Sequence, residues 1–545
     1  MSEARSTHPG VRWWPAVMVA TAGTMVLAWV WFSDGGRTGQ DRVLMSYPVA
    51  LVTVLLLTIW LVFFSRMSRR ARLTAAALVL AALAFVAVTT RVKGVTGDLV
   101  PILEWRWASH VPPPIERAPS PLPLEPAPRG TAPPVSAAES ERSSPLRAAA
   151  PDPANPPVSK IAAGEFSQFL GSSRNGIIGG VRLADDWTTK PPRLIWRRPV
   201  GAGWSGFAVS HGLAVTQEQR GDREMVIAYS LADGKPKWSH GDDAHYESTI
   251  AGEGPRATPT ISGGRVFTLG STGLLNCLDL ETGKSIWRRD VGADNQSPQP
   301  DWGRSSSPLL VDELVVVTAG GSAGHSLVAY NQETGASAWH AGDDVASYSS
   351  PILTTLAGVR QIVVLNQSSV TGHDPATGRV LWNHEWPRQQ PSVAIPVILS
   401  EDRVLLSAGY GIGSRVLQIS RQGEAVAATL VWESPRLKAK FTNPVLHDGF
   451  VYGLDDGVLV CLDPATGERR WRSGRYGHGQ TLLVGNRLLV TTEDGDVVLV
   501  EASPDAHREL ARFTAFSQKQ WNPPALAGRY LLVRTDTEAA CYELP

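Results

Sequence analysis

The sequence predicts an eight-bladed, all-β propeller that is preceded by three transmembrane α-helices and a disordered, proline-rich linker. Three observations lead to this fold class. Apolar runs dominate the first ninety or so residues, and each run is long enough to cross a bilayer. A segment rich in proline, alanine and serine follows. From there to the end, tryptophans recur at intervals of 39 to 52 residues, which is close to the ~40 to 50 residues of a four-stranded propeller blade.

These changes of composition divide the 545 residues into four parts. Residues 1–92 are expected to form the membrane anchor and 93–110 a juxtamembrane segment. Residues 111–159 should be an extended linker, because so few aromatic residues cannot bury enough apolar surface to repay ordering. Residues 160–545 should form the propeller.

Three uncharged runs, Trp13 to Phe32, Leu44 to Phe64 and Leu73 to Thr90, predict the membrane-spanning helices. None carries an ionisable residue near its centre, which favours an anchor over a proton or ion path. The connection between the last two runs is rich in arginine, at Arg66, Arg69, Arg70 and Arg72. The positive-inside rule therefore predicts a multi-pass inner-membrane protein with a cytoplasmic amino terminus and a periplasmic propeller. The alternative, a cleaved signal peptide over the first run, is disfavoured by the two spans that follow.

The juxtamembrane segment contains Trp105 and Trp107 on either side of Arg106. Indole and guanidinium groups are typical of the membrane interface, so this segment is expected to dock there.

Charge and motif content exclude several classes of function. The numbers of basic residues (Lys plus Arg) and acidic residues (Asp plus Glu) are both 51, so no net positive charge favours the binding of nucleic acid. The sequence contains no HExxH and no Walker loop, and its histidines lack ligand spacing. The segment GGSAGHS, Gly320 to Ser326, fits GxSxG by letter, but its place between strands indicates an ordinary loop. We therefore assign no catalytic and no metal-binding residue.

A hairpin unit recurs within the predicted propeller, for example CLDLETGKSIW and CLDPATGERRW. An aspartate begins the turn, a glycine supplies the positive φ, and a tryptophan follows four residues later, where it is expected to join one blade to the next. The turn glycines are Gly234, Gly283, Gly335, Gly378 and Gly467. The matching tryptophans are Trp238, Trp287, Trp339, Trp382 and Trp471.

The three cysteines, Cys277, Cys461 and Cys541, occupy equivalent positions in three different blades. Other blades have alanine or glycine there, so the position calls for a small core residue and a disulfide is not expected. The last blade, which contains Cys541, lacks an outer strand. The segment RLIWRRPV around Trp196 is expected to supply it and to close the ring.

This combination of small residue, Asp, Thr-Gly and Trp resembles the repeat of the pyrroloquinoline quinone (PQQ) propeller superfamily. The segment FSQFLGSSRNGIIGG, with Phe169, Gly171, Arg174 and Gly176, is similar to the lead-in before the first blade in many of its members. The superfamily includes quinoprotein dehydrogenases and non-enzymatic relatives such as the outer-membrane barrel-assembly lipoprotein. The resemblance leaves PQQ with calcium as a candidate cofactor. Three features argue against this cofactor. The blades are short, no two cysteines are adjacent, and the calcium-binding residues of the dehydrogenases have no counterpart here.

Loops that enter the inner strands of a propeller converge on its central funnel. Cations and indoles in these loops suit a planar anionic ligand such as PQQ. The alternative is that the arginines bind loop carbonyls while the tryptophans fill the funnel. The candidate residues are Arg256, Arg304, Trp302, Lys440, His478, Trp521 and Asn522, with Trp204 and Ser349 in comparable positions.

Two functions remain. The first is a membrane-anchored binding or scaffold module of the cell envelope that presents propeller loops to a protein or small-molecule ligand. The alternative is a membrane-bound PQQ-dependent alcohol or sugar dehydrogenase that passes electrons to a membrane quinone. Short blades and the missing calcium set favour the first, so we expect no enzymatic activity.

Overall fold

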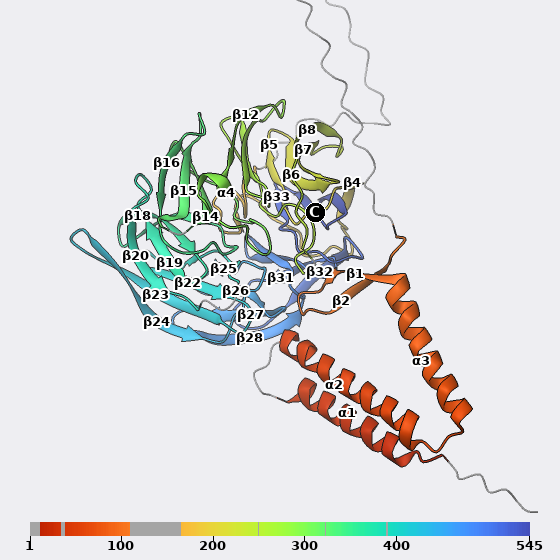
Figure 1. Ribbon diagram of the computed structural model, residues 1–545. Coiled ribbons are helices and arrows are strands. Elements are labelled where there is room, and N and C mark those ends of the chain that lie inside the picture. Colours follow the sequence, from red (N-terminus) through yellow and green to blue (C-terminus); the bar gives the residue numbers. More distant parts are fainter. Residues whose placement is uncertain (1–10, 34–38, 109–164, 249, 322, 388–390) are drawn as a thin grey trace, which may run out of the picture.

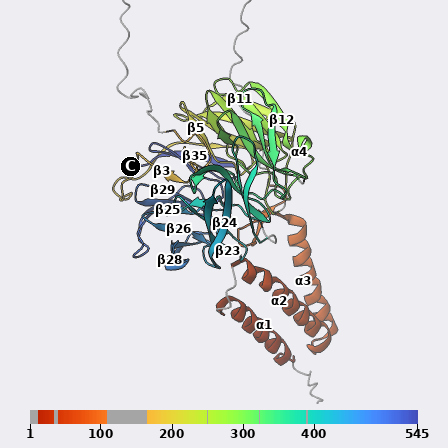
Figure 2. The same ribbon diagram turned by 90° about the vertical axis from the view of Figure 1, so that its left-hand side faces the viewer.

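The computed structural model describes residues 11–33, 39–108 and 165–545, except 249, 322 and 388–390. In this part of the chain, eight sheets of at least four strands form a propeller with α-helices on one side (Figures 1 and 2). The predicted fold class is confirmed for the propeller and for helices apolar enough to span a membrane. The predicted linker lies almost entirely outside the described residues.

The helices predicted to form the anchor, and called the anchor below, are α1 Trp14–Phe32, α2 Gly39–Ile59 with a π-helical extension η1 Trp60–Phe64, and α3 Arg69–Thr89. All three spans are long and apolar enough to cross a membrane. Helix α3 begins four residues before its apolar run because Ser68 caps it, its hydroxyl accepting a hydrogen bond from the Ala71 amide. Helix α1 packs along α2, whereas α3 contacts η1 and diverges from α2 toward the propeller (Figure 1).

A hairpin that the sequence did not indicate follows α3 directly. Its strands are β1 Thr90–Val95 and β2 Pro101–Trp105. This β1–β2 hairpin contains most of the segment expected to dock at the membrane interface. It lies between the helices and the propeller (Figure 1).

Blades 1 to 4 follow one another along the chain, each as a four-stranded antiparallel sheet. Blade 1 contains β5 Ala208–Ser210, β6 Leu213–Arg220, β7 Arg223–Ser230 and β8 Pro236–Asp242. Blade 2 contains β9 Thr260–Ser262, β10 Arg265–Leu269, β11 Leu274–Asp279 and β12 Ser285–Asp290, followed by the short helix α4 Val291–Asp294. Blade 3 contains β13 Leu309–Val311, β14 Leu314–Gly321, β15 His325–Asn331 and β16 Ser337–Ala341. Blade 4 contains β17 Ile352–Leu356, β18 Val359–Leu365, β19 Ser369–His373 and β20 Val380–Glu385.

Blades 5 to 8 repeat the pattern, with additions from upstream in the last two. Blade 5 contains β21 Val397–Ile398, β22 Arg403–Ala408, β23 Gly413–Gln422 and β24 Ala425–Ser434. Blade 6 contains β25 Val445–His447, β26 Phe450–Asp455, β27 Val458–Asp463 and β28 Glu468–Arg475. Blade 7 contains β29 Gln480–Val484, β30 Arg487–Thr491, β31 Asp496–Glu501 and β32 Glu509–Thr514, with β3 Ile177–Ile178 added in parallel to β29. Blade 8 contains β33 Ala525–Ala527, β34 Tyr530–Arg534, β35 Glu538–Glu543 and β4 Arg193–Pro199.

Blade 8 closes the ring in the way that the sequence predicts. Strand β4 pairs antiparallel with β35, and Trp196 lies opposite Cys541 in this pairing. The first strands of neighbouring blades contact each other and form the inner ring of the propeller.

Each cysteine lies directly across the sheet from a tryptophan: Cys277 from Trp287 and Cys461 from Trp471, like Cys541 from Trp196. A large residue at the cysteine position would collide with the indole, which explains the demand for a small one. All three thiols are free and buried, and burial raises the pKa of Cys277 and of Cys541 to about 12.

The turn glycines have two roles: they form the turn, and they leave room for the tryptophan ring of the preceding blade. The Trp287 indole N–H donates to the Gln332 carbonyl of the next blade, 2.8 Å away, and its ring covers Gly335. The same arrangement joins Trp238 to Gly283. Trp382 differs, because blade 5 has no Thr-Gly turn to receive it, and its indole donates to Gln361 within its own blade.

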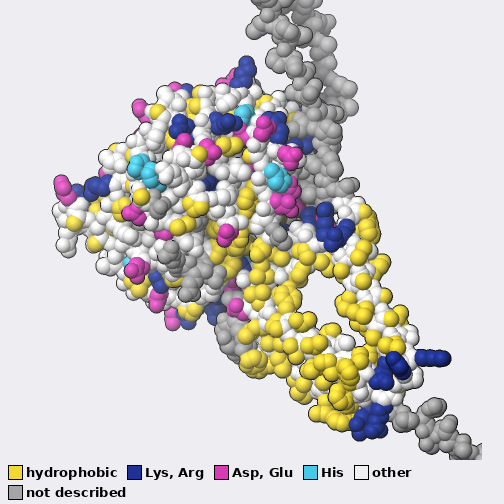
Figure 3. All heavy atoms as spheres, in the orientation of Figure 1, with side chains coloured by type: hydrophobic (Ala, Val, Ile, Leu, Met, Phe, Trp, Pro, Cys, Tyr) yellow, Lys and Arg dark blue, Asp and Glu magenta, His cyan; other side chains and the backbone are white. Residues whose placement is uncertain are grey.

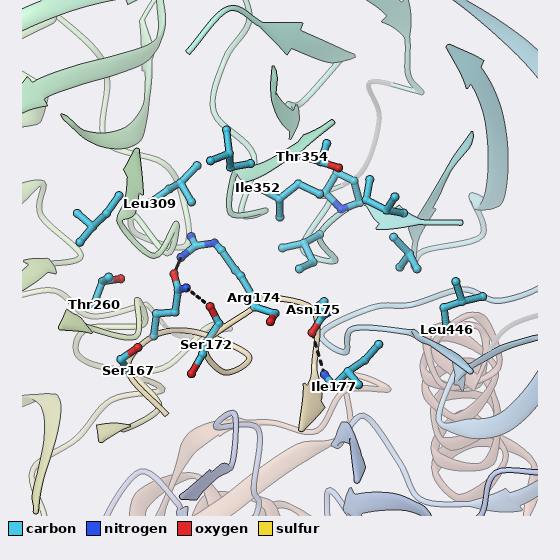
Figure 4. A pocket seen from close by; sticks show the side chains of 18 of the residues that line it. Ser167, Ser172, Arg174, Asn175, Ile177, Thr260, Leu309, Ile352, Thr354 and Leu446 are labelled. Carbon is cyan, nitrogen blue, oxygen red and sulfur yellow. Dashed lines mark hydrogen bonds between the residues drawn. The ribbon is translucent and has the colours of Figure 1, made fainter. Parts of the chain in front are cut away.

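The lead-in crosses the face of the propeller that lies away from the anchor. There Arg174 extends toward Leu309 and Ile352 (Figure 4) and is fully buried in the axis of the ring. Its guanidinium donates to the carbonyls of Ser307, Pro308 and Pro351, and burial lowers its pKa to about 9. The Arg174 side chain therefore ties blades 3 and 4 to the lead-in. A cavity of about 520 Å³ lies beside it, between the lead-in and the first strands.

Candidate functional site

The funnel on the anchor side of the ring contains a cavity of about 340 Å³. Loops that enter the first strands supply most of its aromatic wall, and the loop between β22 and β23 supplies one ring, Tyr410. The other rings are Trp204, Trp302, Tyr348, Phe441 and Trp521. The rings form one continuous cluster, in which Tyr410 contacts both Trp302 and Phe441. Trp302 stacks on Tyr348 with centroids 5.2 Å apart, and Trp521 lies 4.8 Å from Phe441.

In several of these loops a serine, threonine or asparagine stands directly before a proline, as at Thr258, Ser307, Ser350 and Asn522, and hydrogen bonds of these residues hold the loops in position. The Ser307 hydroxyl accepts a hydrogen bond from the Thr258 amide of the preceding blade, at 3.0 Å. The Ser350 hydroxyl accepts in the same way from the Ser307 amide, at 2.9 Å. Asn522 donates to the carbonyls of Gly203 and Ser205 across the ring closure. Asn522 therefore links blades and does not line the cavity.

Arg256 lines the cavity, but its guanidinium is occupied by the protein itself. It donates to the carbonyls of Ala251 and Gly252, at 2.9 and 2.8 Å, and to that of Gly254. It also lies over the Tyr246 ring, 4.6 Å from the centroid. Burial lowers its pKa to about 10.

Arg304 occupies the corresponding loop of the next blade, yet it is not part of the cavity wall. Its guanidinium donates to the Ala319 carbonyl at 2.6 Å and to the Ser297 hydroxyl at 2.8 Å. It is buried, and burial lowers its pKa. The two arginines thus take equivalent places in the sequence and point to different surroundings.

The turn of the β1–β2 hairpin forms one side of the mouth of the funnel. Lys440 donates to the Gly97 carbonyl and, at 2.5 Å, to the Gln40 side chain at the start of α2. The Gly97 amide donates to Glu493 at 2.6 Å. His478 Nε2 lies 3.2 Å from the Asp98 carboxylate and is outside the cavity wall.

Burial dominates the electrostatics of this junction. It lowers the pKa of Lys440, whose ammonium also lies 4.6 Å from the centroid of the Tyr410 ring. It lowers the pKa of Lys519 to about 8, and this side chain donates to the Val95 carbonyl at 2.9 Å. Burial alone would raise the pKa of Asp98, but the contact with His478 lowers it below its usual value.

Of the residues proposed from the sequence, Arg256, Trp302, Lys440 and Trp521 line the cavity, as does Trp204. Sequence reasoning missed Glu493 and Lys519, together with the hairpin turn. Glu493 lies between the second and third strands of blade 7, whereas the candidates came only from loops before first strands. No repeat connects the hairpin turn to the propeller, so the sequence held no signal for their contact.

The family model described as outer membrane protein assembly factor BamB (PQQ_2) matches residues 223–473 and 455–543, which together exceed half of the chain. The chain belongs to this BamB family.

Curated members of the family align at low identity. BamB of Yersinia pestis is 25% identical over 277 residues, covering 46% of this chain and 67% of that protein. BamB of Moranella endobia (strain PCIT) is 26% identical over 264 residues, covering 45% and 64%. This chain therefore spans about two thirds of the curated relatives' length. Among solved structures, a europium-containing methanol dehydrogenase superposes with a TM-score of 0.54 at 12% identity, over 70% of this chain and 98% of that one, which shows the fold alone.

The funnel of this BamB-family chain does not fit PQQ with calcium. A planar tricarboxylate needs several uncommitted donors, but the donors of Arg256 are taken by carbonyls and Lys440 holds the hairpin. Among the described residues, no three His, Cys, Asp or Glu side chains gather to hold a metal ion. The wall is instead largely aromatic.

Proposed function

We propose that this chain is a membrane-anchored binding module of the cell envelope, which presents its propeller to a protein partner as an assembly factor or scaffold does. Membership of the BamB family supports a protein-binding role. The quinoprotein dehydrogenase alternative lacks support from the funnel, where the charged wall residues Arg256 and Lys440 bind the protein's own groups.

The observation that carries the proposal is the outer strand of blade 5. Strand β24 is the longest outer strand in the described blades. It hydrogen-bonds on one side only, with β23, and also packs against β20 of blade 4. From Ala425 to Trp432 it has no charged side chain, and Leu430 and Val431 are 45% and 39% exposed. Proteins usually protect such an edge with charge or proline. A long apolar edge suits the addition of an extended strand from a partner, with backbone hydrogen bonds for affinity and side-chain contacts for specificity.

Site-specific photocrosslinking in the intact envelope tests this role. A photoreactive residue in place of Val431 should give one discrete crosslinked protein, and Leu430→Lys should reduce its yield about tenfold. The matched control is the same photoreactive residue at Arg470, an exposed position on the outer strand of blade 6, which should give no such product. Equal products from both positions would contradict a docking edge on β24. Dye-linked oxidation of an alcohol or sugar by the purified chain with PQQ and calcium would overturn the non-enzymatic reading.

The orientation of the anchor is part of the proposal. The arginine-rich turn between η1 and α3 lies at the end of the helices farthest from the propeller (Figure 3). Together with the positive-inside rule, this supports a cytoplasmic amino terminus and a periplasmic propeller.

A further inference from the structure

The mouth of the funnel cavity lies at the boundary of the membrane anchor. Val95, Gly97 and Leu99 of the β1–β2 hairpin form part of its wall, and so does Gln40 in the first turn of α2. The Tyr47 hydroxyl donates to the Leu99 carbonyl at 2.9 Å, which fixes the hairpin to α2. The cavity therefore opens at the level where α2 leaves the membrane.

The surfaces of α2 and α3 that face each other below the hairpin are apolar and lead to the mouth of the cavity. Helices α2 and α3 diverge toward the hairpin, and apolar side chains cover both of them up to the edge of the propeller (Figures 1 and 3). The hairpin itself exposes apolar groups, with Leu103 at 55%, and Trp107, two residues after β2, is 68% exposed. Indoles at such a position are typical of the headgroup region. If the three helices span a bilayer, the gap between α2 and α3 directly beneath the hairpin is accessible to lipid.

The chemistry of the cavity wall suits hydrocarbon. Aromatic and aliphatic side chains predominate, among them Phe169, Ile250 and Val393. The charged wall residues, Arg256 and Lys440, are already hydrogen-bonded to the protein. An apolar cavity offers water few partners and binds apolar ligands in preference.

We propose that the funnel binds one acyl chain of a membrane phospholipid, which enters through the gap between α2 and α3, while the headgroup stays at the mouth beside Gln40. The hairpin then forms the wall between the acyl chain and the aqueous compartment. This site does not depend on the partner edge of β24, which lies on the outer rim of the ring.

The test uses the full-length chain in phosphatidylcholine vesicles that contain a trace of phosphatidylcholine with a diazirine near the end of one acyl chain. After irradiation, peptides are mapped by mass spectrometry. Adducts are expected on the funnel residues Trp302, Tyr348 and Tyr410 in addition to those on α1, α2 and α3. Adducts confined to the helices and the outer face of the hairpin would overturn the proposal.

Cavity-filling variants distinguish occupancy from chance proximity. Ser305→Trp, on the wall, should reduce the funnel adducts about fivefold and leave helix adducts unchanged, because the added indole takes the volume of the chain. Ser285→Trp, on the exposed outer strand β12, is the matched control and should change neither. Should Ser305→Trp lower the thermal midpoint, Val393→Trp fills the same cavity from another loop. Funnel adducts that persist in both filling variants would refute the site.

Discussion

Gly97 is the residue on which the union of anchor and propeller depends. Its amide and carbonyl are bound by Glu493 and Lys440, and an added Cβ would lie only 1.9 Å from the His478 ring. No side chain fits between the hairpin turn and the funnel. A glycine is required here for close approach, because its φ is not in the left-handed region.

Gly97→Ala should therefore release the hairpin from the funnel while both parts stay folded. The measurement is limited proteolysis of the full chain in detergent, with faster cleavage near the hairpin turn as the expected result. Gly94→Ala is the matched control, because its Cβ would meet nothing closer than 3.7 Å, at the Lys519 ammonium. Equal cleavage rates for Gly97→Ala and the wild-type chain would show that the contact does not hold the parts together.

Single residues also show where sequence reasoning stops. Arg256 and Arg304 occupy the same place in consecutive repeats, so the sequence could predict the loop on which each lies. The sequence could not predict the direction of each side chain, because local hydrogen bonds determine it. Arg256 turns toward the funnel, whereas Arg304 turns toward the Ala319 carbonyl. His478 was a candidate for the same reason, but its partner Asp98 belongs to a hairpin far away in the chain.

At the scale of elements, the Thr-Gly hairpin and the tryptophan of the preceding blade form one structural unit. The period of the tryptophans and the small residue opposite each of them could be predicted from the sequence, because the same packing contact recurs from blade to blade. The different contact of Trp382 could not be predicted from the residues of its own blade. It results from the absence of a Thr-Gly turn in blade 5.

Two glycines, Gly335 and Gly358, allow the two roles of a turn glycine to be measured separately: its positive φ and its close contact with the tryptophan of the preceding blade. Gly335 and Gly358 both have a φ of 70°, but a Cβ on Gly335 would lie 2.7 Å from the Trp287 ring, whereas nothing lies within 4 Å of one on Gly358. Gly358→Ala should cost only the backbone strain, about 1 to 2 kcal/mol. Gly335→Ala should cost more, and the thermal midpoint of the full chain should fall further.

The double variant Gly335→Ala with Trp287→Ala checks this interpretation. Trp287→Ala alone should destabilise by about 3 to 5 kcal/mol. Adding Gly335→Ala to it should then cost no more than Gly358→Ala does, because the colliding ring is gone. Strictly additive losses would show that ring and glycine act independently.

At the scale of the whole molecule, three helices apolar enough to span a membrane lie on the funnel side of the propeller, and the β1–β2 hairpin lies between the two parts (Figure 1). The sequence predicted an anchor, a linker and a propeller in order. It could not predict that the anchor returns to the propeller through β1 and β2, because that contact joins unrelated segments by shape and by a few polar groups.

The membrane topology can be measured with introduced cysteines. The three native thiols are buried, so a membrane-impermeant maleimide at neutral pH should label only an added one. Asp243→Cys, at a side chain that is 93% exposed on blade 1, should react once the outer membrane is permeabilised. Arg70→Cys, in the first turn of α3, should react only after the inner membrane is opened. The reverse pattern would place the propeller in the cytoplasm.

Closure of the ring has a consequence for biosynthesis. Strand β4 is among the first propeller segments to be made, yet its partner β35 is the last, and the ion pair between them joins Arg193 to Glu543, 350 positions apart. Until β35 has been synthesised, both β4 and β34 carry unpaired backbone groups. Contacts this distant in sequence form slowly, and unpaired edges favour association with other chains. A chain that lacks β35 therefore has two unpaired strand edges at which it can aggregate.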